Sequence, residues 1–346
     1  MHGIEKPYDL LISTVSREWH GLADVVPFID STVAAPLLFP IREGNITIDI
    51  DGRKVAMGNH KALVADLRGR TDLAEDDQFK GLHIPKNSYT IIDNRTLWDT
   101  ASKAIAGIGA KVTCIGTLRG CKTFFISIQL AEDGGQFNVN GDTYQATLNL
   151  VTSHDGTMAA QVFDSTVRVV CMNTLRWSLA TKGAMGFMTY HTSGSAIAME
   201  RIGELANDAL AGRAVFRSNM EYLASVGCDA DTAELLALGF FATQTGEVKL
   251  STRLKNAAEE IAMLHSRGDG NLGRSMYDAL NGFTQYYTSG SGTGKKSSRE
   301  DKAFKANFGA AADHKSMFAN MLLSPDTVAM LTAKGREARL ELARIV

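Results

Sequence analysis

The sequence predicts an α+β protein in which an antiparallel β-meander covered by helices precedes a mostly helical C-terminal half. Apolar and polar residues alternate with a period of two within residues 111–171, which is typical of a sheet. From residue 195 onward the apolar residues recur at helical spacing. We therefore expect an antiparallel sheet-plus-helix core over residues 1–190 and a helical region over residues 191–346.

Composition places the chain among ordinary globular proteins. It has 346 residues, 45% hydrophobic and 21% charged, with a formal net charge of −2. Those values exclude a disordered chain, a collagen-like chain and a highly charged tail protein. The sequence has no apolar run of 18 residues, no apolar export core near its start and only four cysteines, so we expect a cytoplasmic protein without a membrane span or a disulfide framework.

The first 90 residues are expected to be irregular, with short strands. Five of the six prolines lie there. Residues 46–50 and 53–56 alternate on either side of an Asp51-Gly52 pair, which strongly favours a β-hairpin. Two further strands are expected at residues 60–66 and 89–92. Together with the meander, they would make an antiparallel sheet spanning residues 46–171.

A helix is expected at residues 95–108, where Leu97, Trp98 and Ala101 begin a helical repeat. Strands are expected next at residues 111–117 and 122–130. Further along, one set of alternating residues is apolar and the other polar, which predicts a sheet with one face buried and one exposed to water. The apolar set is Tyr144, Ala146, Leu148 and Leu150, and the polar set is Thr143, Gln145, Thr147 and Asn149. A second helix, at residues 172–182, would cover this sheet.

The C-terminal half predicts six helices. Ser324-Pro325 marks the start of the last one, because proline suits the first helical position. Residues 288–298 (TSGSGTGKKSS) predict a flexible Gly/Ser/Lys loop. The helices are expected at residues 195–226, 231–241, 252–266, 273–287, 301–322 and 326–345.

Basic residues gather in stretches that contain no acid. Residues 100–131 carry four basic residues and residues 165–199 carry three, whereas residues 132–164 carry five acids and no Lys or Arg. If the first two stretches lie on one side, they form a surface suited to a phosphate backbone. The candidate phosphate contacts are Arg119, Lys122, Arg168, Arg176 and Lys182, with a mobile contact from Lys295 and Lys296.

Two other interpretations of these charges stay open. The basic residues can be scattered, solvated charges on a nearly neutral protein. Arg168 and Arg176 can also pair with distant carboxylates such as Asp155 or Asp164.

The lysine-containing loop is not a phosphate-binding P-loop. Its spacing places Ser289 where the motif requires its first glycine, and Lys295 is followed by Lys296 rather than by Ser or Thr. Aromatic residues offer another contact with bases. The Tyr286-Tyr287 pair beside this loop is the better stacking candidate, because Trp98 and Trp177 lie on apolar helical faces and are expected in the core.

A catalytic site is the main alternative to a binding surface. Cys171, His154, Asp155 and Asn173 could converge, with the cysteine as nucleophile, the histidine as base and the asparagine as an orienting amide. His154 and Cys171 lie at opposite ends of a two-strand path, however, and a structural role for Cys171 on the buried strand face with Val167 is the simpler expectation. The cysteine and histidine spacings match no metal motif, so we predict no metal site and no cofactor.

Three segments carry a resemblance to a known family. They are residues 115–125 (IGTLRGCKTFF), 152–156 (TSHDG) and 167–175 (VRVVCMNTL). The chain resembles the phage/plasmid-like family labelled domain of unknown function 932. This resemblance implies a phage or mobile-element context and implies no known activity. Cys121 stands where the resemblance leads us to expect a second small residue such as glycine.

A looser likeness is architectural. A meander with a helix across it, followed by helices, is similar to the core of ring-forming single-strand annealing recombinases. The sequence thus favours a non-enzymatic protein that binds single-stranded DNA, self-associates and could anneal strands in recombination. One alternative is a Cys/His-dependent enzyme or host-defence effector. The other is a structural or regulatory partner protein that binds no nucleic acid, which a large exposed apolar face would favour.

Overall fold

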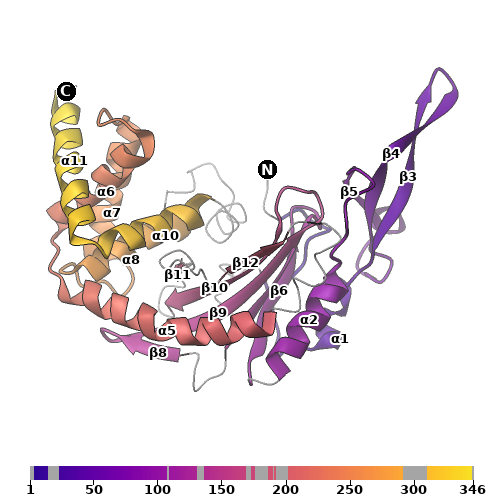
Figure 1. Cartoon of the computed structure of the whole chain (residues 1–346), viewed down its shortest axis with the longest axis horizontal. Coiled ribbons are helices and arrows are strands. Elements are labelled where there is room, and N and C mark those ends of the chain that lie inside the picture. Colours follow the sequence, from indigo (N-terminus) through magenta and orange to yellow (C-terminus); the bar gives the residue numbers. More distant parts are fainter. Residues whose placement is uncertain are drawn as a thin grey trace. The chain divides into compact units, whose positions relative to one another are not determined.

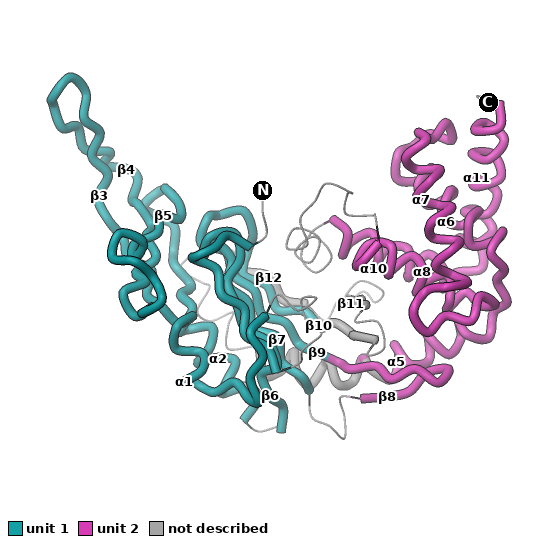
Figure 2. The backbone as a smooth tube through the Cα atoms, turned by 180° about the vertical axis from the view of Figure 1, so that it is seen from behind, with its two compact units in different colours: residues 1–135, 147–164, 185–210 teal, residues 136–146, 165–184, 211–346 magenta. Residues whose placement is uncertain are grey.

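A computed structural model gives the fold as two compact units that interleave along the chain (Figures 1 and 2). The first unit contains residues 1–135, 147–164 and 185–210, and the second contains residues 136–146, 165–184 and 211–346. The structure describes residues 4–14, 23–106, 109–130, 136–168, 173–175, 186–189, 191, 202–290 and 310–344. Sheets precede a mostly helical C-terminal half, which confirms the predicted α+β class. The predicted boundary at residue 190 lies inside the last segment of the first unit.

The main sheet of the first unit has the strand order β10-β9-β7-β6-β1-β2, with β12 paired to β10. Its central pairs, β6 with β7 and β7 with β9, are antiparallel, as the meander predicted. The strands are β1 (Leu11–Ser13), β2 (Asp24–Val25), β6 (Lys111–Leu118), β7 (Thr123–Gln129), β9 (Asp142–Ser153), β10 (Ala160–Arg168) and β12 (Gly186–Thr189).

Both faces of the central strands β6 and β7 and of the later part of β9 are buried, so the predicted water-exposed face is wrong. Phe124 and Phe125 point to opposite faces of β7, yet both are fully buried. Thr147 and Asn149, which were expected in water, are only 7% and 9% exposed. Hydrogen bonds make this burial possible: the Ser127 hydroxyl donates to Asn149 Oδ1 over 2.8 Å, so the polar side chains on this face bond to one another.

A separate three-stranded sheet, β3-β4-β5, contains the predicted hairpin. Its strands are β3 (Ile41–Ile50), β4 (Arg53–Asp66) and β5 (Phe79–His83). Asp51 and Gly52 have φ values of 51° and 79°, which matches the turn type that Asp-Gly favours between two strands. The prediction of one sheet over residues 46–171 is therefore wrong, and residues 89–92 form no strand. The distal half of the β3–β4 hairpin projects from the rest of the first unit (Figures 1 and 2).

Among the described residues, two α-helices lie wholly within the first unit, α1 (Ser31–Ala34) and α2 (Asn94–Ala106). The second confirms the helix predicted at residues 95–108, and it buries Leu97 and Trp98 as its repeat implied. The helix predicted at residues 172–182 is wrong at its start. Residues 173–175 form strand β11 (Asn173–Leu175), which pairs with β10, and the rest of that segment lies outside the described residues.

The second unit is built around a helix that is buried on every side, α8 (Met276–Thr288). Strand β8 (Gln136–Val139) pairs with the start of β9, whose Tyr144 hydroxyl hydrogen-bonds the Tyr277 hydroxyl of α8. Tyr277 in turn donates to the Asp142 carboxylate over 2.7 Å, which fixes this part of β9 on the helical core.

The described residues of the C-terminal half form five other helices, and all six lie where the sequence predicted helices. They are α5 (Ile202–Ser225), α6 (Ala230–Thr245), α7 (Thr252–Arg267), α10 (Ala310–Leu322) and α11 (Pro325–Ala343). Ser324 caps α11 by accepting from the Thr327 N–H, with Pro325 at the first helical position as expected. Among the described residues, no helix is both long enough and apolar enough to cross a membrane.

Candidate nucleic-acid interface

The β6–β7 turn contains two of the predicted phosphate contacts, Arg119 and Lys122, and its backbone N–H groups already donate to a carboxylate. Arg119, Gly120 and Cys121 all have left-handed φ values, of 62°, 67° and 65°. The Asp9 carboxylate accepts the N–H groups of Gly120 and Cys121 over 2.8 and 2.7 Å, and that of Glu5 over 2.7 Å. Successive N–H groups of this kind form an anion-binding nest. Because Asp9 fills the nest, a phosphate at this turn must be held by side chains.

Arg119 is held by a neighbouring turn. Its guanidinium forms an ion pair with Asp155 over 2.9 Å and donates to the Thr157 hydroxyl over 2.8 Å. Burial opposes ionisation of Asp155, but the hydrogen bonds from Thr157 and the nearby Arg119 charge outweigh it and lower the pKa of this carboxyl. Arg119 therefore ties the β6–β7 turn to the β9–β10 turn, and its charge is already partly neutralised.

Lys122 is the second predicted contact that the structure describes in full. Its side chain is partly exposed, and the described part of the chain provides no ion-pair partner for it. Arg168 lies on β10 opposite Asn173, but its side chain is outside the described residues. The remaining predicted contacts also lie outside them: Arg176, Lys182, Lys295 and Lys296.

The projecting hairpin carries basic residues that the sequence reasoning did not select. Residues 52–65 contain Arg53, Lys54, His60 and Lys61 and no acid. Arg53 and Lys54 are exposed and form no ion pair with any described residue, whereas Lys61 pairs with Glu43 over 2.6 Å. The test for acid-free stretches that selected Arg119 would also have found this strand.

One face of the hairpin is apolar and exposed. Ile48 pairs across the strands with Val55, and Ile50 pairs with Arg53. We define the hairpin face as Ile48, Ile50, Val55 and Met57, which are 43%, 54%, 49% and 38% exposed. Arg53 shares this face because directly paired residues lie on the same side of a sheet.

Two acids flank Ile50 in sequence: Asp49 points away from the hairpin face, and Asp51 lies in the turn. Asp49 lies between Ile48 and Ile50 and pairs with Lys54, so both of these charged residues lie on the opposite face. The hairpin face therefore combines exposed apolar side chains with Arg53, which forms no ion pair with any described residue.

The catalytic alternative gains little from the described residues. His154 is 1% exposed, and its Nε2 lies 2.8 Å from Asn94 Oδ1. Burial lowers the pKa of His154 to about 4, so the ring is neutral near pH 7. Cys171 lies outside the described residues. Burial raises the pKa of Cys121 and of Cys228 to about 12, which makes both thiols poor nucleophiles.

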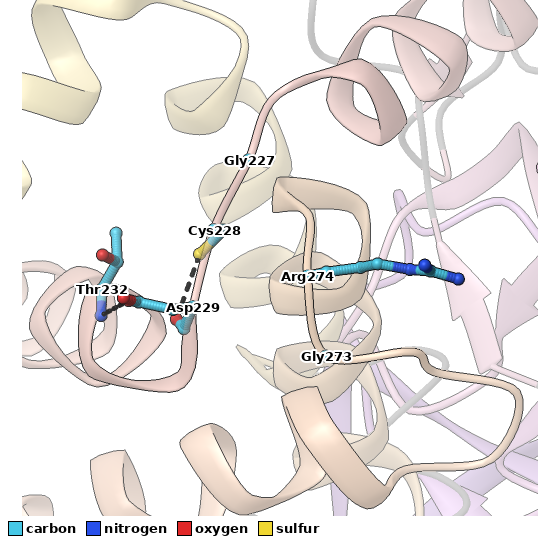
Figure 3. Close-up of a pocket in the computed structure, with 6 residues that line it drawn as sticks. All are labelled: Gly227, Cys228, Asp229, Thr232, Gly273 and Arg274. Atoms are coloured by element: carbon cyan, nitrogen blue, oxygen red, sulfur yellow. Dashed lines mark hydrogen bonds between the residues drawn. The ribbon is translucent and has the colours of Figure 1, made fainter.

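A pocket of about 410 Å³ lies in the second unit, but it holds no group arranged for chemistry (Figure 3). The Asp229 carboxylate accepts the Thr232 N–H over 2.8 Å and so caps α6. The Arg274 side chain extends away from Asp229 and Thr232 (Figure 3). Within the described residues, no three His, Cys, Asp or Glu side chains are grouped as metal ligands. The pocket is lined by Gly227, Cys228, Asp229, Thr232, Gly273 and Arg274.

The prediction that the Tyr286-Tyr287 pair stacks on bases is wrong. Tyr286 and Tyr287 are 6% and 7% exposed, because α8 is buried along its whole length. Tyr287 contacts the Phe283 ring, with centroids 5.1 Å apart, inside the core of the second unit. Trp98 is buried as expected, and Trp177 lies outside the described residues.

The fold and this surface define an α+β protein with a projecting, partly basic β-ribbon. The chain belongs to the family described as a domain of unknown function, DUF932, which matches residues 81–308, about two thirds of its length. This match confirms the resemblance to domain of unknown function 932. No curated protein and no solved structure matches the chain.

Proposed function

We propose that this protein binds single-stranded nucleic acid and that the β3–β4 hairpin is its main described contact. The observation that carries the proposal is the exposed hairpin on which Arg53 and Lys54 are free of ion pairs within the described residues. A nucleic-acid backbone attracts such exposed cations, because each phosphate contact releases condensed counterions. A two-stranded ribbon that stands away from its unit is accessible to a strand along its length.

Lys122 extends the proposed contact toward the main sheet. Glu5 connects the hairpin sheet to the β6–β7 turn, because it pairs with Lys80 of β5 over 2.5 Å and its N–H donates to the Asp9 carboxylate that holds the turn. Arg168, Arg176, Lys182, Lys295 and Lys296 stay predicted contributors. Arg119 takes a lesser part in this proposal, because Asp155 already neutralises it.

The biological setting is part of the same proposal. We place the protein in the cytoplasm, in a phage or other mobile element, and we expect it to self-associate and to anneal complementary strands. The expectation of annealing rests on the architectural likeness that the sequence predicts, because no solved structure matches the chain. A Cys171-dependent enzyme is the competing proposal, and rapid alkylation of a low-pKa thiol at Cys171 would favour it.

Fluorescence anisotropy with a labelled 30-nucleotide oligo(dT) tests the binding. We expect wild-type protein to bind with strong salt dependence. We also expect Arg53→Ala plus Lys54→Ala to reduce the log–log salt slope by about 1.4, at about 0.7 for each lost phosphate contact.

The matched control is Arg95→Ala plus Lys103→Ala, which removes two exposed charges from α2 of the same unit. Its salt slope should equal that of the wild type. No binding by the wild type at low salt, or equal losses in the two variants, would contradict the proposal.

A further inference from the structure

We infer that the hairpin face contacts unpaired bases, so that the ribbon distinguishes single strands from duplex; this inference rests on the proposed function. The four side chains of the hairpin face are 38–54% exposed although they are aliphatic. Exposed, contiguous apolar residues on a projecting element mark a surface that binds something.

The chemistry of the hairpin face matches a base better than a phosphate. Aliphatic side chains gain nothing from contact with a charged, hydrated backbone, but they are stabilised by covering the apolar face of a base. Unpaired bases leave parts of those faces open, whereas a duplex covers them by stacking. Inserting Ile, Met or similar side chains into a duplex costs a few kcal/mol of unstacking per step. The hairpin face should therefore prefer unpaired strands.

The position of Arg53 adds charge complementarity. Arg53 pairs with Ile50 on the apolar side, while Asp49 points to the opposite side with Lys54. A strand whose bases rest on Ile48 and Val55 would thus meet a guanidinium within reach of its phosphate. The hairpin face therefore offers a cation beside apolar side chains, which matches a strand that carries a phosphate beside each base.

The length of the face suits a short run of bases. Residues 53–57 of β4 cover roughly 14 Å, at about 3.4 Å for each residue step. Stacked nucleotides also repeat at about 3.4 Å along one strand. The hairpin face can therefore cover a few successive bases, and its effect on affinity should be separable from that of the phosphate contacts.

The test changes the apolar pair without removing strand preference. Ile48→Thr plus Val55→Thr keeps two β-branched residues at directly paired positions and makes both polar. We expect affinity for oligo(dT) to fall about tenfold with an unchanged salt slope, because no phosphate contact is lost. Affinity for a duplex of equal length should stay the same.

The matched control is Thr47→Ser plus Ala56→Ser, a directly paired change on the opposite face of the hairpin. It should bind oligo(dT) like the wild type. Ile50→Thr alone is a milder second variant, and a thermal melt of each protein establishes that it is folded.

The possible results separate this inference from the proposed function. If wild-type protein binds oligo(dT) and both hairpin-face variants keep full affinity, the inference is overturned while the proposed function stands. If the variants weaken single-strand and duplex binding equally, the preference for bases is also overturned. If a hairpin-face variant has a lower native mass than the wild type in the absence of oligonucleotide, the hairpin face joins two copies of the chain. That result would overturn the inference. Absence of wild-type binding would contradict the proposed function itself.

Discussion

Asp9 is the residue on which the β6–β7 turn depends. Its carboxylate is 1% exposed and accepts two N–H groups of a turn in which three successive residues are left-handed. Non-glycine residues adopt that conformation only when their surroundings hold them there. Burial raises the pKa of Asp9, although the N–H groups that it accepts oppose this shift. The N-terminal segment therefore stabilises a turn that lies more than 100 residues away in the sequence.

Removing this carboxylate should cost much of the stability of the first unit. Asp9→Ala leaves two buried N–H groups of the turn unpaired, at about 1–3 kcal/mol each, so we expect a loss of about 3 kcal/mol in the free energy of unfolding. Urea denaturation measures it. Asp30→Ala is the control, because Asp30 also accepts two N–H groups over 2.9 Å but is exposed. A loss from Asp9→Ala no larger than the control's would refute this role.

His154 predicts how stability changes with pH. Its pKa falls to about 4 on folding, mainly because of burial, while the unfolded value is about 6.5. The unfolded chain therefore binds a proton that the folded chain does not, and stability is lost as pH falls from 6.5 toward 4. The full loss is roughly 3 kcal/mol. Burial also lowers the pKa of His191, which adds to the loss in the same direction.

Urea denaturation at pH 7.5, 6 and 5 measures this dependence. His154→Gln removes the titrating ring and should flatten the curve over that range, even if the variant is less stable at every pH. Wild-type stability that stays constant from pH 7.5 to pH 5 would show that His154 is not buried as neutral imidazole.

At the scale of elements, α6 and α11 approach each other through two glycines. A Cβ at Gly239 would lie 1.9 Å from the Leu331 carbonyl oxygen, and one at Gly335 would lie 2.0 Å from that of Leu235. Real Cβ atoms do not come this close to a backbone oxygen. The two helices can be this near only because both positions lack a side chain.

Gly335→Ala has two opposing effects on stability, and their magnitudes decide whether the variant is more or less stable than the wild type. Alanine has a helix propensity about 1 kcal/mol better than glycine. Overpacking a tight contact costs about 1–3 kcal/mol, and here the contact is with backbone that cannot rotate away. We expect net destabilisation, seen as a lower melting temperature. The exposed Glu337→Ala in the same helix should change it little, and a raised melting temperature for Gly335→Ala would show that the helices separate easily.

Elements whose signals are local were predictable from the sequence. Asp51-Gly52 located the hairpin, and Ser324-Pro325 located the start of α11. The polar face of β9 was mispredicted because Thr147 and Asn149 look solvated in sequence, and their burial depends on partners such as Ser127 in another strand. Local pattern cannot show which faces the rest of the fold will cover.

The candidate site was predictable only in part, for the same reason. Arg119 was selected because its stretch lacks acids, but its partner Asp155 lies in a different turn. Predicting Arg53 and Lys54 as contacts requires both the acid-free stretch and the knowledge that the hairpin projects from its unit. Charge along the chain indicates where cations gather, and folding decides which of them stay available.

At the scale of the whole molecule, the interleaving of the two units limits how the chain can be divided. Strand β9 begins in the second unit and continues in the first. Residues 165–184 belong to the second unit again, and residues 185–210 to the first, before the chain stays in the second unit from residue 211 onward. A fragment ending at residue 190 would carry Tyr144 without Tyr277 and Phe216, two aromatic residues whose rings it contacts. A fragment starting there would leave the helical core without β8 and β11. No single cut yields either unit whole, so this protein is better studied by point variants than by truncation.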